Sequence, residues 1–321
     1  MTHYIAPQTT RQFSSEMSLN SVEQQEFWRQ VTQARLTVSP NVELAYAMIK
    51  HPDNARAIVV SSGRVESYIK YQELIFDIYQ QGYSVYALDH RGQGLSSRLT
   101  ANPHQGHVDK FDDYISDFNA FIEAVVKPEQ HTKLFLVGHS MGGAIGTLYM
   151  AQQPDTFESA VFSAPMFGIK LPMSKPFIRW LAEKLDNGNK GMAPNYILGG
   201  QDYKPTEFKN NNLTHSKLRY EHYRGLYQAQ PQLQLGSPTN RWLVESIDAA
   251  DKCISIASNI ATPILILQAS EDTIVDNQSQ NNAVANQCAL IKIEKARHEI
   301  FMEKDKARNK ALTQLFKFFE Q

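Results

Sequence analysis

One serine in this sequence has the surroundings that nucleophilic chemistry requires. Ser140 is the centre of Gly138-His139-Ser140-Met141-Gly142, which follows the apolar run Leu134–Val137 and leads into the small residues Gly143-Ala144. A strand before the motif and a helix after it would place the serine on a tight turn, which neighbours without side chains allow to form. Because a G-x-S-x-G string alone arises by chance in roughly one chain in ten of this length, the assignment depends on these flanking elements.

A serine hydroxyl needs a base to become nucleophilic, and the base needs a carboxylate to orient it. After a serine on such a turn, the acid follows in the chain and the histidine comes last. His298 lies just beyond the last predicted strand and Asp272 just beyond the strand before it. Both loops are therefore expected at the sheet edge that carries Ser140. Glu271 and Asp276 lie within reach of the same loop and remain alternatives for the acid.

Acyl transfer through a serine also needs N–H donors for the oxyanion of the tetrahedral intermediate. We expect one from the backbone of Met141, directly after the nucleophile, and the other from the backbone of Arg64, in the loop after the apolar run Ile58–Val60. Gly63, Arg64 and His139 are predicted to contact the substrate. Two of them also fit simpler roles: Gly63 as an ordinary turn glycine, and His139 as a side chain that packs or hydrogen-bonds on the turn.

Short apolar runs that alternate with helical patterns must position these residues. Continuous apolar runs such as Ile58–Val60 and Ile264–Leu267 are typical of strands buried on both faces of a parallel sheet. The alternation predicts a doubly wound α/β sheet. The predicted strands are Leu36–Val38, Val42–Met48, Ala57–Ser61, Ser84–Leu88, Leu134–Val137, Ala160–Ser163, Ile264–Gln268 and Ala289–Ile293. The predicted helices are Tyr68–Gln81, Phe111–Val126, Met141–Gln153, Asn277–Asn286 and Lys304–Phe319.

One stretch, from about Met166 to Arg241, lacks the strand periodicity and is rich in Pro, Asn, Gln and Tyr. It is too long for a structureless loop in a compact domain. We therefore expect a helical cap at 166–241, inserted between an N-terminal part of the core at 1–165 and a C-terminal part at 242–321. Such a cap would cover the strand ends, where open α/β sheets bind ligands.

Composition excludes several other classes of protein. Lys plus Arg (32) nearly balance Asp plus Glu (33), which gives no reason to expect a nucleic-acid partner. The two cysteines, Cys253 and Cys288, form neither a disulfide framework nor a metal-ligand cluster and fit a reducing compartment. No P-loop, cofactor motif or metal site is evident, and no window is apolar enough to span a membrane. Because residues 1–4 show no signal-peptide pattern, we expect a cytoplasmic protein.

With these motifs in order, the chain resembles the monoacylglycerol lipase-like serine hydrolases and, among them, the bacterial lysophospholipases of the L-two type. The resemblance implies the α/β-hydrolase fold, a mostly parallel central sheet flanked by helices with an inserted helical cap. It also implies hydrolysis of the fatty-acyl ester of lysophospholipids. Many of these enzymes have His-Gly where this chain has Ser62-Gly63, a change that the backbone donor should survive. The resemblance includes Gly63–Ser67, Asp89–Gly94, Gly138–Gly143, Ser163–Gly168, Leu213–Ser216, Val275–Asn277 and His298–Ile300.

The predicted cap carries its own indication of a phospholipid. It holds 11 Lys or Arg against 5 Asp or Glu, although the whole chain has a net charge of −1. Such a surface fits an anionic cytoplasmic leaflet or a substrate phosphate, and equally an ordinary solvated helical surface. Arg64 is a second candidate for contact with the headgroup. Apolar residues of the cap are candidates for an acyl channel: Leu171, Met173, Phe177, Ile178 and Trp180.

Three other functions remain open on the sequence alone. A monoacylglycerol lipase or general carboxylesterase would use the same chemistry on a neutral ester. An aminopeptidase would need an acidic anchor for the substrate amine, which the basic cap disfavours. A non-catalytic binding protein on a hydrolase scaffold would usually lack a triad residue, whereas here Ser140, Asp272 and His298 are all present.

Overall fold

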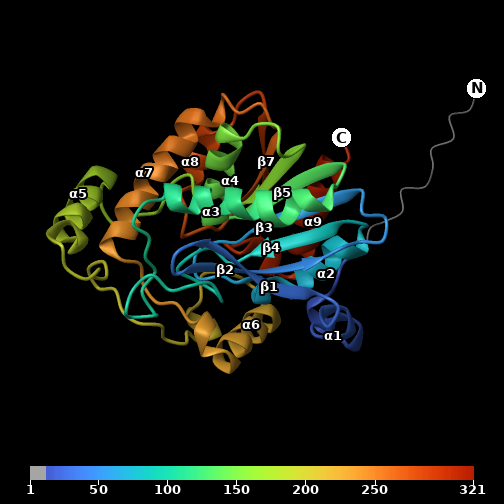
Figure 1. Ribbon diagram of the computed structural model, residues 1–321, viewed down its shortest axis with the longest axis horizontal. Coiled ribbons are helices and arrows are strands. Elements are labelled where there is room, and N and C mark those ends of the chain that lie inside the picture. Colours follow the sequence, from blue (N-terminus) through green and yellow to red (C-terminus); the bar gives the residue numbers. More distant parts are fainter. Residues whose placement is uncertain (1–11) are drawn as a thin grey trace, which may run out of the picture.

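The apolar runs of the sequence form a single eight-stranded sheet in the order β1-β2-β4-β3-β5-β6-β7-β8. The computed structural model describes residues 12–321, so the four residues behind the signal-peptide expectation lie outside the described part (Figure 1). All eight predicted strands are present, with ends that differ by a few residues. They are β1 (Thr32–Ser39), β2 (Val42–Ile49), β3 (Arg56–Ser61), β4 (Ser84–Leu88), β5 (Lys133–His139), β6 (Ser159–Ser163), β7 (Ile264–Ala269) and β8 (Cys288–Ile293).

The sheet is mostly parallel, as predicted. Only the β1–β2 and β2–β4 pairs are antiparallel, while β4, β3, β5, β6, β7 and β8 run in the same direction. Ser61 of β3 is in register with Gly138 of β5, and His139 of β5 with Ser163 of β6. The loops that leave these strands therefore start side by side at one edge of the sheet, where α/β folds bind ligands.

Helices cover both faces of the sheet. Consecutive residues of a strand point to opposite faces: Leu136 of β5 lies against Gly146 of α4, whereas its neighbour Phe135 stacks on Phe319 of α9. This arrangement confirms the α/β-hydrolase fold class. The helices are α1 (Val22–Trp28), α2 (Gln72–Gln80), α3 (Asp112–Phe121), α4 (Met141–Gln152), α5 (Lys175–Leu185), α6 (Lys217–Ala229), α7 (Asn240–Ala257), α8 (Asn277–Asn282) and α9 (Asp305–Phe319).

Two of these helices, α1 and α7, were not predicted. The sequence of α7 is clearly amphipathic, with buried residues such as Trp242, Ala249 and Cys253 on one face, so its periodic signal was present and was missed. The predicted helix at 111–126 is present but changes at Ile122 into one turn of π-helix. The predicted helix at 277–286 ends at Asn282.

The segment between β6 and α7 contains α5, α6 and short 3-10 turns. Figure 1 shows α5 beside α7 on one side of the molecule and α6 apart from them, below the sheet. Since α7 begins at Asn240, the boundary predicted at 241/242 falls within its first turn.

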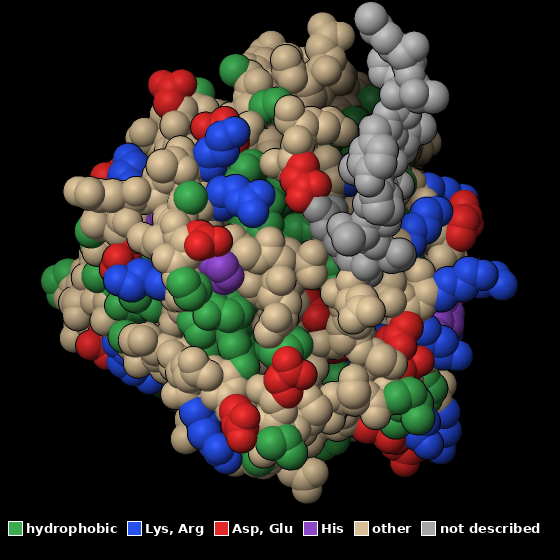
Figure 2. Space-filling view, turned by 90° about the vertical axis from the view of Figure 1, so that its right-hand side faces the viewer, with side chains coloured by type: hydrophobic (Ala, Val, Ile, Leu, Met, Phe, Trp, Pro, Cys, Tyr) green, Lys and Arg blue, Asp and Glu red, His purple; other side chains and the backbone are tan. Residues whose placement is uncertain are grey.

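No helix within residues 12–321 combines the length and the apolar character needed to cross a bilayer. On the face that Figure 2 shows, acidic and basic side chains are interspersed.

Candidate active site

Ser140 lies on the turn between β5 and α4 in a strained backbone conformation, with φ 49° and ψ −115°. The turn is possible only because its neighbours lack side chains. A Cβ on Gly142 would lie 2.0 Å from the carbonyl oxygen of Ser61, and one on Gly138 would lie 2.9 Å from the Cα of Gly143. A non-glycine residue at positive φ in a tight turn is typical of a functional site. This geometry directs Ser140 into a cavity that its side chain lines.

The two backbone amides predicted to bind an oxyanion lie beside this turn. Met141 is the first residue of α4, where helix N–H groups have no partner in the helix and the helix dipole favours negative charge. Among the described residues, neither the N–H of Met141 nor that of Arg64 donates a hydrogen bond. Both remain candidates for the oxyanion hole.

The predicted base and acid are in contact. Nδ1 of His298 lies 2.8 Å from Oδ2 of Asp272, and both side chains are buried. The other oxygen of Asp272 accepts hydrogen bonds from the backbone N–H groups of Ile274 (2.8 Å) and Val275 (3.0 Å). Burial alone would raise the pKa of Asp272, but the bond to His298 and these N–H donors hold it below its usual value.

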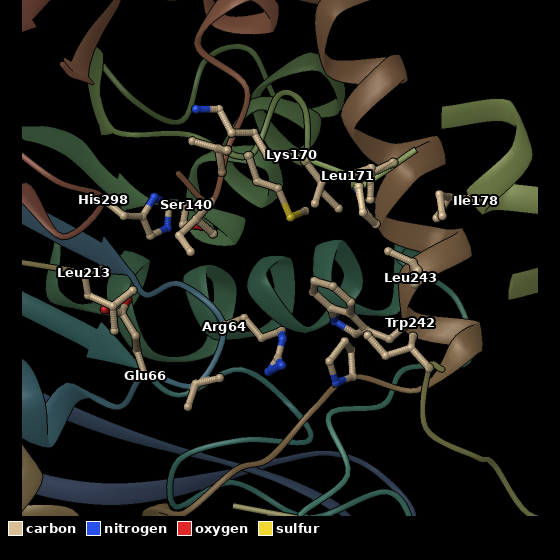
Figure 3. A pocket seen from close by; sticks show the side chains of 18 of the residues that line it. Arg64, Glu66, Ser140, Lys170, Leu171, Ile178, Leu213, Trp242, Leu243 and His298 are labelled. Atoms are coloured by element: carbon tan, nitrogen blue, oxygen red, sulfur yellow. The ribbon is translucent and has the colours of Figure 1, made fainter. Parts of the chain in front are cut away.

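The geometry of the pair leaves Nε2 of His298 for the nucleophile. Because an ionised carboxylate only accepts hydrogen bonds, Nδ1 of His298 donates to Asp272. Figure 3 shows the imidazole of His298 next to Ser140 at one side of the cavity. Asp272 contacts His298, and His298 lies next to Ser140, so these three residues remain the candidates for the triad.

The two alternative acids have other partners. Asp276 caps the start of α8, where its carboxylate accepts hydrogen bonds from the backbone N–H of Gln278 and Ser279. Glu271 is half-exposed, and its carboxylate lies 3.2 Å from Nε2 of His215. Neither carboxylate contacts the imidazole of His298.

The loop after β3 passes directly behind the nucleophile. A Cβ on Gly63 would lie 2.9 Å from the His139 ring and 3.1 Å from Cβ of Ser140, so a larger residue would displace the loop. The N–H of Gly63 donates a hydrogen bond to Oε2 of Glu66 at 2.6 Å, so it is not free for an oxyanion. Gly63 does not line the cavity, unlike Arg64, so the predicted contact of Gly63 with substrate remains a prediction.

The Arg64 side chain extends along the cavity away from His298 (Figure 3). Both of its terminal nitrogens donate to the carbonyl oxygen of Gly236 at 3.0 Å, and the guanidinium lies over the ring of Trp242, 5.3 Å from its centroid. Burial lowers the pKa of Arg64 to about 10. Figure 3 shows the guanidinium directed toward Trp242.

His139 packs against His298, and the centroids of the two imidazole rings are 4.8 Å apart. Its Nδ1 lies 3.1 Å from the carbonyl oxygen of Ser163, which can only accept, so Nδ1 carries the proton. Burial lowers the pKa of His139 and favours the neutral ring. His139 therefore fits the structural role considered in the sequence, and it also lines the cavity.

A buried ion network next to the site was not predicted. Nζ of Lys70, whose side chain is 1% exposed, lies 2.7 Å from Glu66 and 2.6 Å from Glu299. Glu66 also accepts from the hydroxyl of Tyr71 at 2.6 Å. Burial would raise the pKa of Glu66, but Lys70 holds it at about 2. The network ties the loop of Arg64 to the residue after His298. In the sequence, Glu66 and Lys70 have the i,i+4 spacing of a common surface pair, so only their burial reveals them.

The cavity has a volume of about 640 Å³, within the range of small-molecule sites. We call its apolar lobe the part lined by α5 and α7, including Ile178, Leu181, Leu185, Trp242 and Leu243. Figure 3 shows this lobe across the cavity from Ser140 and His298.

We call the polar lobe the part lined by Glu66, Lys70, Tyr223, Arg224 and Glu299. It extends from Glu299, the residue after His298, to Tyr223 and Arg224 of α6. Ser140 and His298 line the same cavity as both lobes.

The acyl-channel residues predicted from the cap separate into two groups. Leu171, Met173 and Ile178 line the cavity. Phe177 and Trp180 do not line it; they are 40% and 51% exposed, because they lie on the other face of α5. Within residues 12–321, no group of three or more His, Cys, Asp or Glu side chains is arranged to hold a metal ion.

The fold and this site together define a serine hydrolase of the α/β-hydrolase class. Residues 52–305 match the family model described as serine aminopeptidase, S33 (Hydrolase_4), and the chain belongs to this family.

Curated relatives agree with this assignment. The chain is 36% identical to lysophospholipase L2 of Escherichia coli strain K12 over 92% of its own length and 89% of that protein. It is 27% identical to monoglyceride lipase of Rattus norvegicus over 69% of its length and 66% of that protein. The family resemblance predicted from the motifs is confirmed.

Solved structures support the fold. A soluble variant of monoglyceride lipase from Saccharomyces cerevisiae superimposes with a TM-score of 0.68 at 19% identity, covering 90% of this chain and 96% of that one. A thermostable carboxyl esterase from Bacillus coagulans superimposes with a TM-score of 0.71 at 16% identity, over 90% and 98% of the two chains.

Proposed function

We propose that this chain is a lysophospholipase, which hydrolyses the fatty-acyl ester of a lysophospholipid to a fatty acid and a glycerophospho-alcohol. The observation that supports this proposal most directly is the lining of the cavity at Ser140, which combines apolar residues of α5 and α7 with charged residues such as Lys70 and Arg224. An acyl chain fits the apolar lobe and a charged headgroup fits the polar lobe. The 36% identity to the Escherichia coli lysophospholipase L2 points to the same substrate class.

In the proposed mechanism, Nε2 of His298 takes the proton of the Ser140 hydroxyl while Oγ attacks the ester carbonyl. The backbone N–H groups of Met141 and Arg64 stabilise the oxyanion. The tetrahedral intermediate collapses to an acyl-enzyme, and His298 returns the proton to the departing glycerol oxygen. Water activated by the same imidazole then releases the fatty acid, while Asp272 orients His298 throughout. No cofactor takes part in this scheme.

The second candidate is a monoacylglycerol lipase, because relatives of that name share the family and the apolar lobe would serve both substrates. The basic lining favours the phospholipid: four Lys or Arg side chains line the cavity against two acidic ones, Glu66 and Glu299. An aminopeptidase would need a free acidic anchor for an amine, and both of these acids pair with Lys70.

The deciding experiment compares turnover of lysophosphatidylethanolamine, monoacylglycerol and a short-chain aryl ester, with Ser140→Ala as control. We expect lysophosphatidylethanolamine to have the highest kcat/KM, and Ser140→Ala to hydrolyse none of the three. Faster hydrolysis of monoacylglycerol than of every lysophospholipid would make this chain a monoacylglycerol lipase. A fluorophosphonate that fails to label Ser140 in the folded protein would instead make it a binding protein.

We further propose that 166–241 acts as a cap that rests on the anionic cytoplasmic face of the inner membrane. Six of the ten exposed large hydrophobic side chains of the described chain lie between residues 173 and 198. Phe177 and Trp180, with ring centroids 5.9 Å apart, lie on the outer face of α5, close in sequence to the basic residues Lys184 and Lys190. Apolar groups flanked by lysines suit an anionic bilayer surface.

Vesicle binding tests this second proposal. We expect the protein to cosediment with phosphatidylglycerol-containing vesicles more than with phosphatidylcholine vesicles. The double variant Phe177→Ser/Trp180→Ser should lose most of this binding and keep its activity on the short-chain ester. Equal binding of the variant and the wild type would contradict it.

A further inference from the structure

Three buried polar atoms without a hydrogen-bond partner gather in the polar lobe. Within the described residues, no partner is found for the hydroxyl of Tyr223, Nε of Arg224 or Oε2 of Glu299. All three residues line the cavity, and Tyr223 and Glu299 are more than nine-tenths buried. An unpaired buried polar group costs about 1–3 kcal/mol, so such groups in one cavity indicate a polar ligand.

Arg224 is also a cation without a carboxylate partner among the described residues. Lys70, the other cation of the lobe, forms ion pairs with Glu66 and Glu299. Arg224 instead lies over two rings of its own helix, with its guanidinium carbon 5.0 Å from the centroid of Tyr220 and 5.3 Å from that of Tyr223. The guanidinium also hydrogen-bonds Tyr203 and Tyr220, while its Nε has no partner. These contacts orient it, and the donors that remain can bind phosphate oxygens.

The contacts lead outward from the catalytic histidine in a definite order. Glu299 follows His298 in the chain, Lys70 joins Glu299 to the ring of Tyr223 (4.4 Å from Nζ to the centroid), and Arg224 comes next on α6. A lysophospholipid has the same order, from the ester through the glycerol hydroxyl to the phosphate. Oε2 of Glu299 would thus lie nearer the ester, and the guanidinium of Arg224 farther from it.

We propose that Arg224 binds the phosphate of the lysophospholipid headgroup and sets the preference of the enzyme for a phosphorylated glycerol. The inference rests on the proposed lysophospholipase function. In this arrangement the Tyr223 hydroxyl donates a second hydrogen bond to the phosphate, and Glu299 accepts one from the glycerol hydroxyl. Arg64, the candidate from the sequence, is directed away toward Trp242 and is bound to Gly236.

The test measures the selectivity ratio, defined as kcat/KM for 1-palmitoyl lysophosphatidylethanolamine divided by kcat/KM for 1-palmitoylglycerol. Both substrates carry the same acyl chain and differ only in the headgroup. Arg224→Met should lower this ratio about 10- to 100-fold, mainly through KM, since it removes charged hydrogen bonds to the phosphate. The matched control Lys217→Met removes the same charge from an exposed position of the same helix and should leave the ratio unchanged.

Each outcome decides between the two proposals. An unchanged ratio in Arg224→Met, with a wild type that hydrolyses the lysophospholipid, would overturn the role of Arg224 and leave the proposed function in place. A wild type that hydrolyses only 1-palmitoylglycerol would overturn the proposed function, and this inference with it.

A second measurement does not depend on the folding of Arg224→Met. The ether lipid 1-O-hexadecyl-glycerophosphoethanolamine should inhibit the wild type about tenfold more strongly than 1-O-hexadecylglycerol, because Arg224 would hold its phosphate. Arg224→Lys, which keeps the charge but loses the fork of donors, should reduce this difference. Equal inhibition of the wild type by the two lipids would contradict the proposal.

Discussion

The two lobes of the cavity are built by opposite means. The apolar lobe lies between α5 and α7, which are joined at the surface by exposed ion pairs such as Arg179–Asp248 (2.6 Å), with side chains 36% and 49% exposed. The polar lobe is fixed by Lys70, 1% exposed, between two carboxylates. Exposed pairs contribute about 0–1 kcal/mol, whereas breaking a buried one costs about 3–5 kcal/mol. The difference suggests an adaptable wall for acyl chains of several lengths and a rigid wall for one kind of headgroup.

The largest effect should come from the residues that both lobes share. Asp272→Asn removes the acceptor that fixes the tautomer of His298, and we expect kcat to fall about 10³- to 10⁴-fold. The fall should be the same for lysophosphatidylethanolamine and monoacylglycerol, because the chemical step is common. Steady-state kinetics on both substrates measures it.

Asp276→Asn is the control for this variant. Asparagine also caps helices well, so α8 should persist and activity should stay within about twofold of the wild type. If Asp276→Asn were the more damaging of the two substitutions, the assignment of Asp272 as the triad acid would be wrong.

The second prediction compares the ion pairs of the two lobes directly. Lys70→Met leaves Glu66 and Glu299 buried without their cation, so the free energy of unfolding should fall by about 3–5 kcal/mol at pH 7. Arg179→Met breaks an exposed pair on the apolar side and should cost less than about 1 kcal/mol. Urea unfolding of both variants measures the difference, and equal losses would contradict the contrast between the lobes.

The pH dependence of Lys70→Met has a definite sign. In the wild type the folded-state pKa of Glu66 is about 2, below its ordinary value of 4.5, so this carboxylate stabilises the fold above pH 4.5 and the contribution is lost as pH falls toward 2. Without Lys70, burial raises the pKa of Glu66 instead. The variant should therefore gain stability as the pH is lowered from 7 to 5, while the wild type does not.

The strands and the candidate triad could be predicted from the sequence, whereas the polar lobe could not. The strands were predictable because runs such as Ile58–Val60 are buried on both faces and bounded by turns. Ser140, Asp272 and His298 follow the ends of the parallel strands β5, β7 and β8, so the topology alone brings their loops to one edge. The pattern of strands along the chain was therefore sufficient to predict the positions of these three residues.

The polar lobe was not predictable by this reasoning. Glu66 and Lys70 have the spacing of a solvent-exposed pair, and their burial depends on Tyr223, more than 150 residues further along the chain. Arg224 lies on α6, whose position over the sheet depends on tertiary contacts that leave no periodic signal. The charge excess of residues 166–241 indicated the region but not the residue.

The third prediction addresses the apolar lobe. Ala182 of α5 is buried and lines this lobe, so Ala182→Phe would fill part of it. We expect kcat/KM for a 16-carbon acyl chain to fall about tenfold relative to an 8-carbon chain, since about two methylenes lose their burial at about 0.8 kcal/mol each. The loss should be the same for phospholipid and glycerol esters. A chain-length series with both headgroups measures it, and a change in headgroup preference would show that the lobes are not independent.

The smallest expected effect concerns Arg64, whose backbone belongs to the proposed oxyanion hole while its side chain lies against Trp242. Arg64→Met keeps the backbone N–H but removes the two bonds to Gly236, which fix the loop of that donor. We expect kcat to fall about threefold for both substrates, because loosening one donor costs less than the roughly 10²-fold loss on removing one. The selectivity ratio should not change, in contrast to Arg224→Met. If Arg64→Met lowered the ratio and Arg224→Met did not, the phosphate would lie beside Trp242, and the headgroup and acyl chain would occupy the lobes in the reverse order.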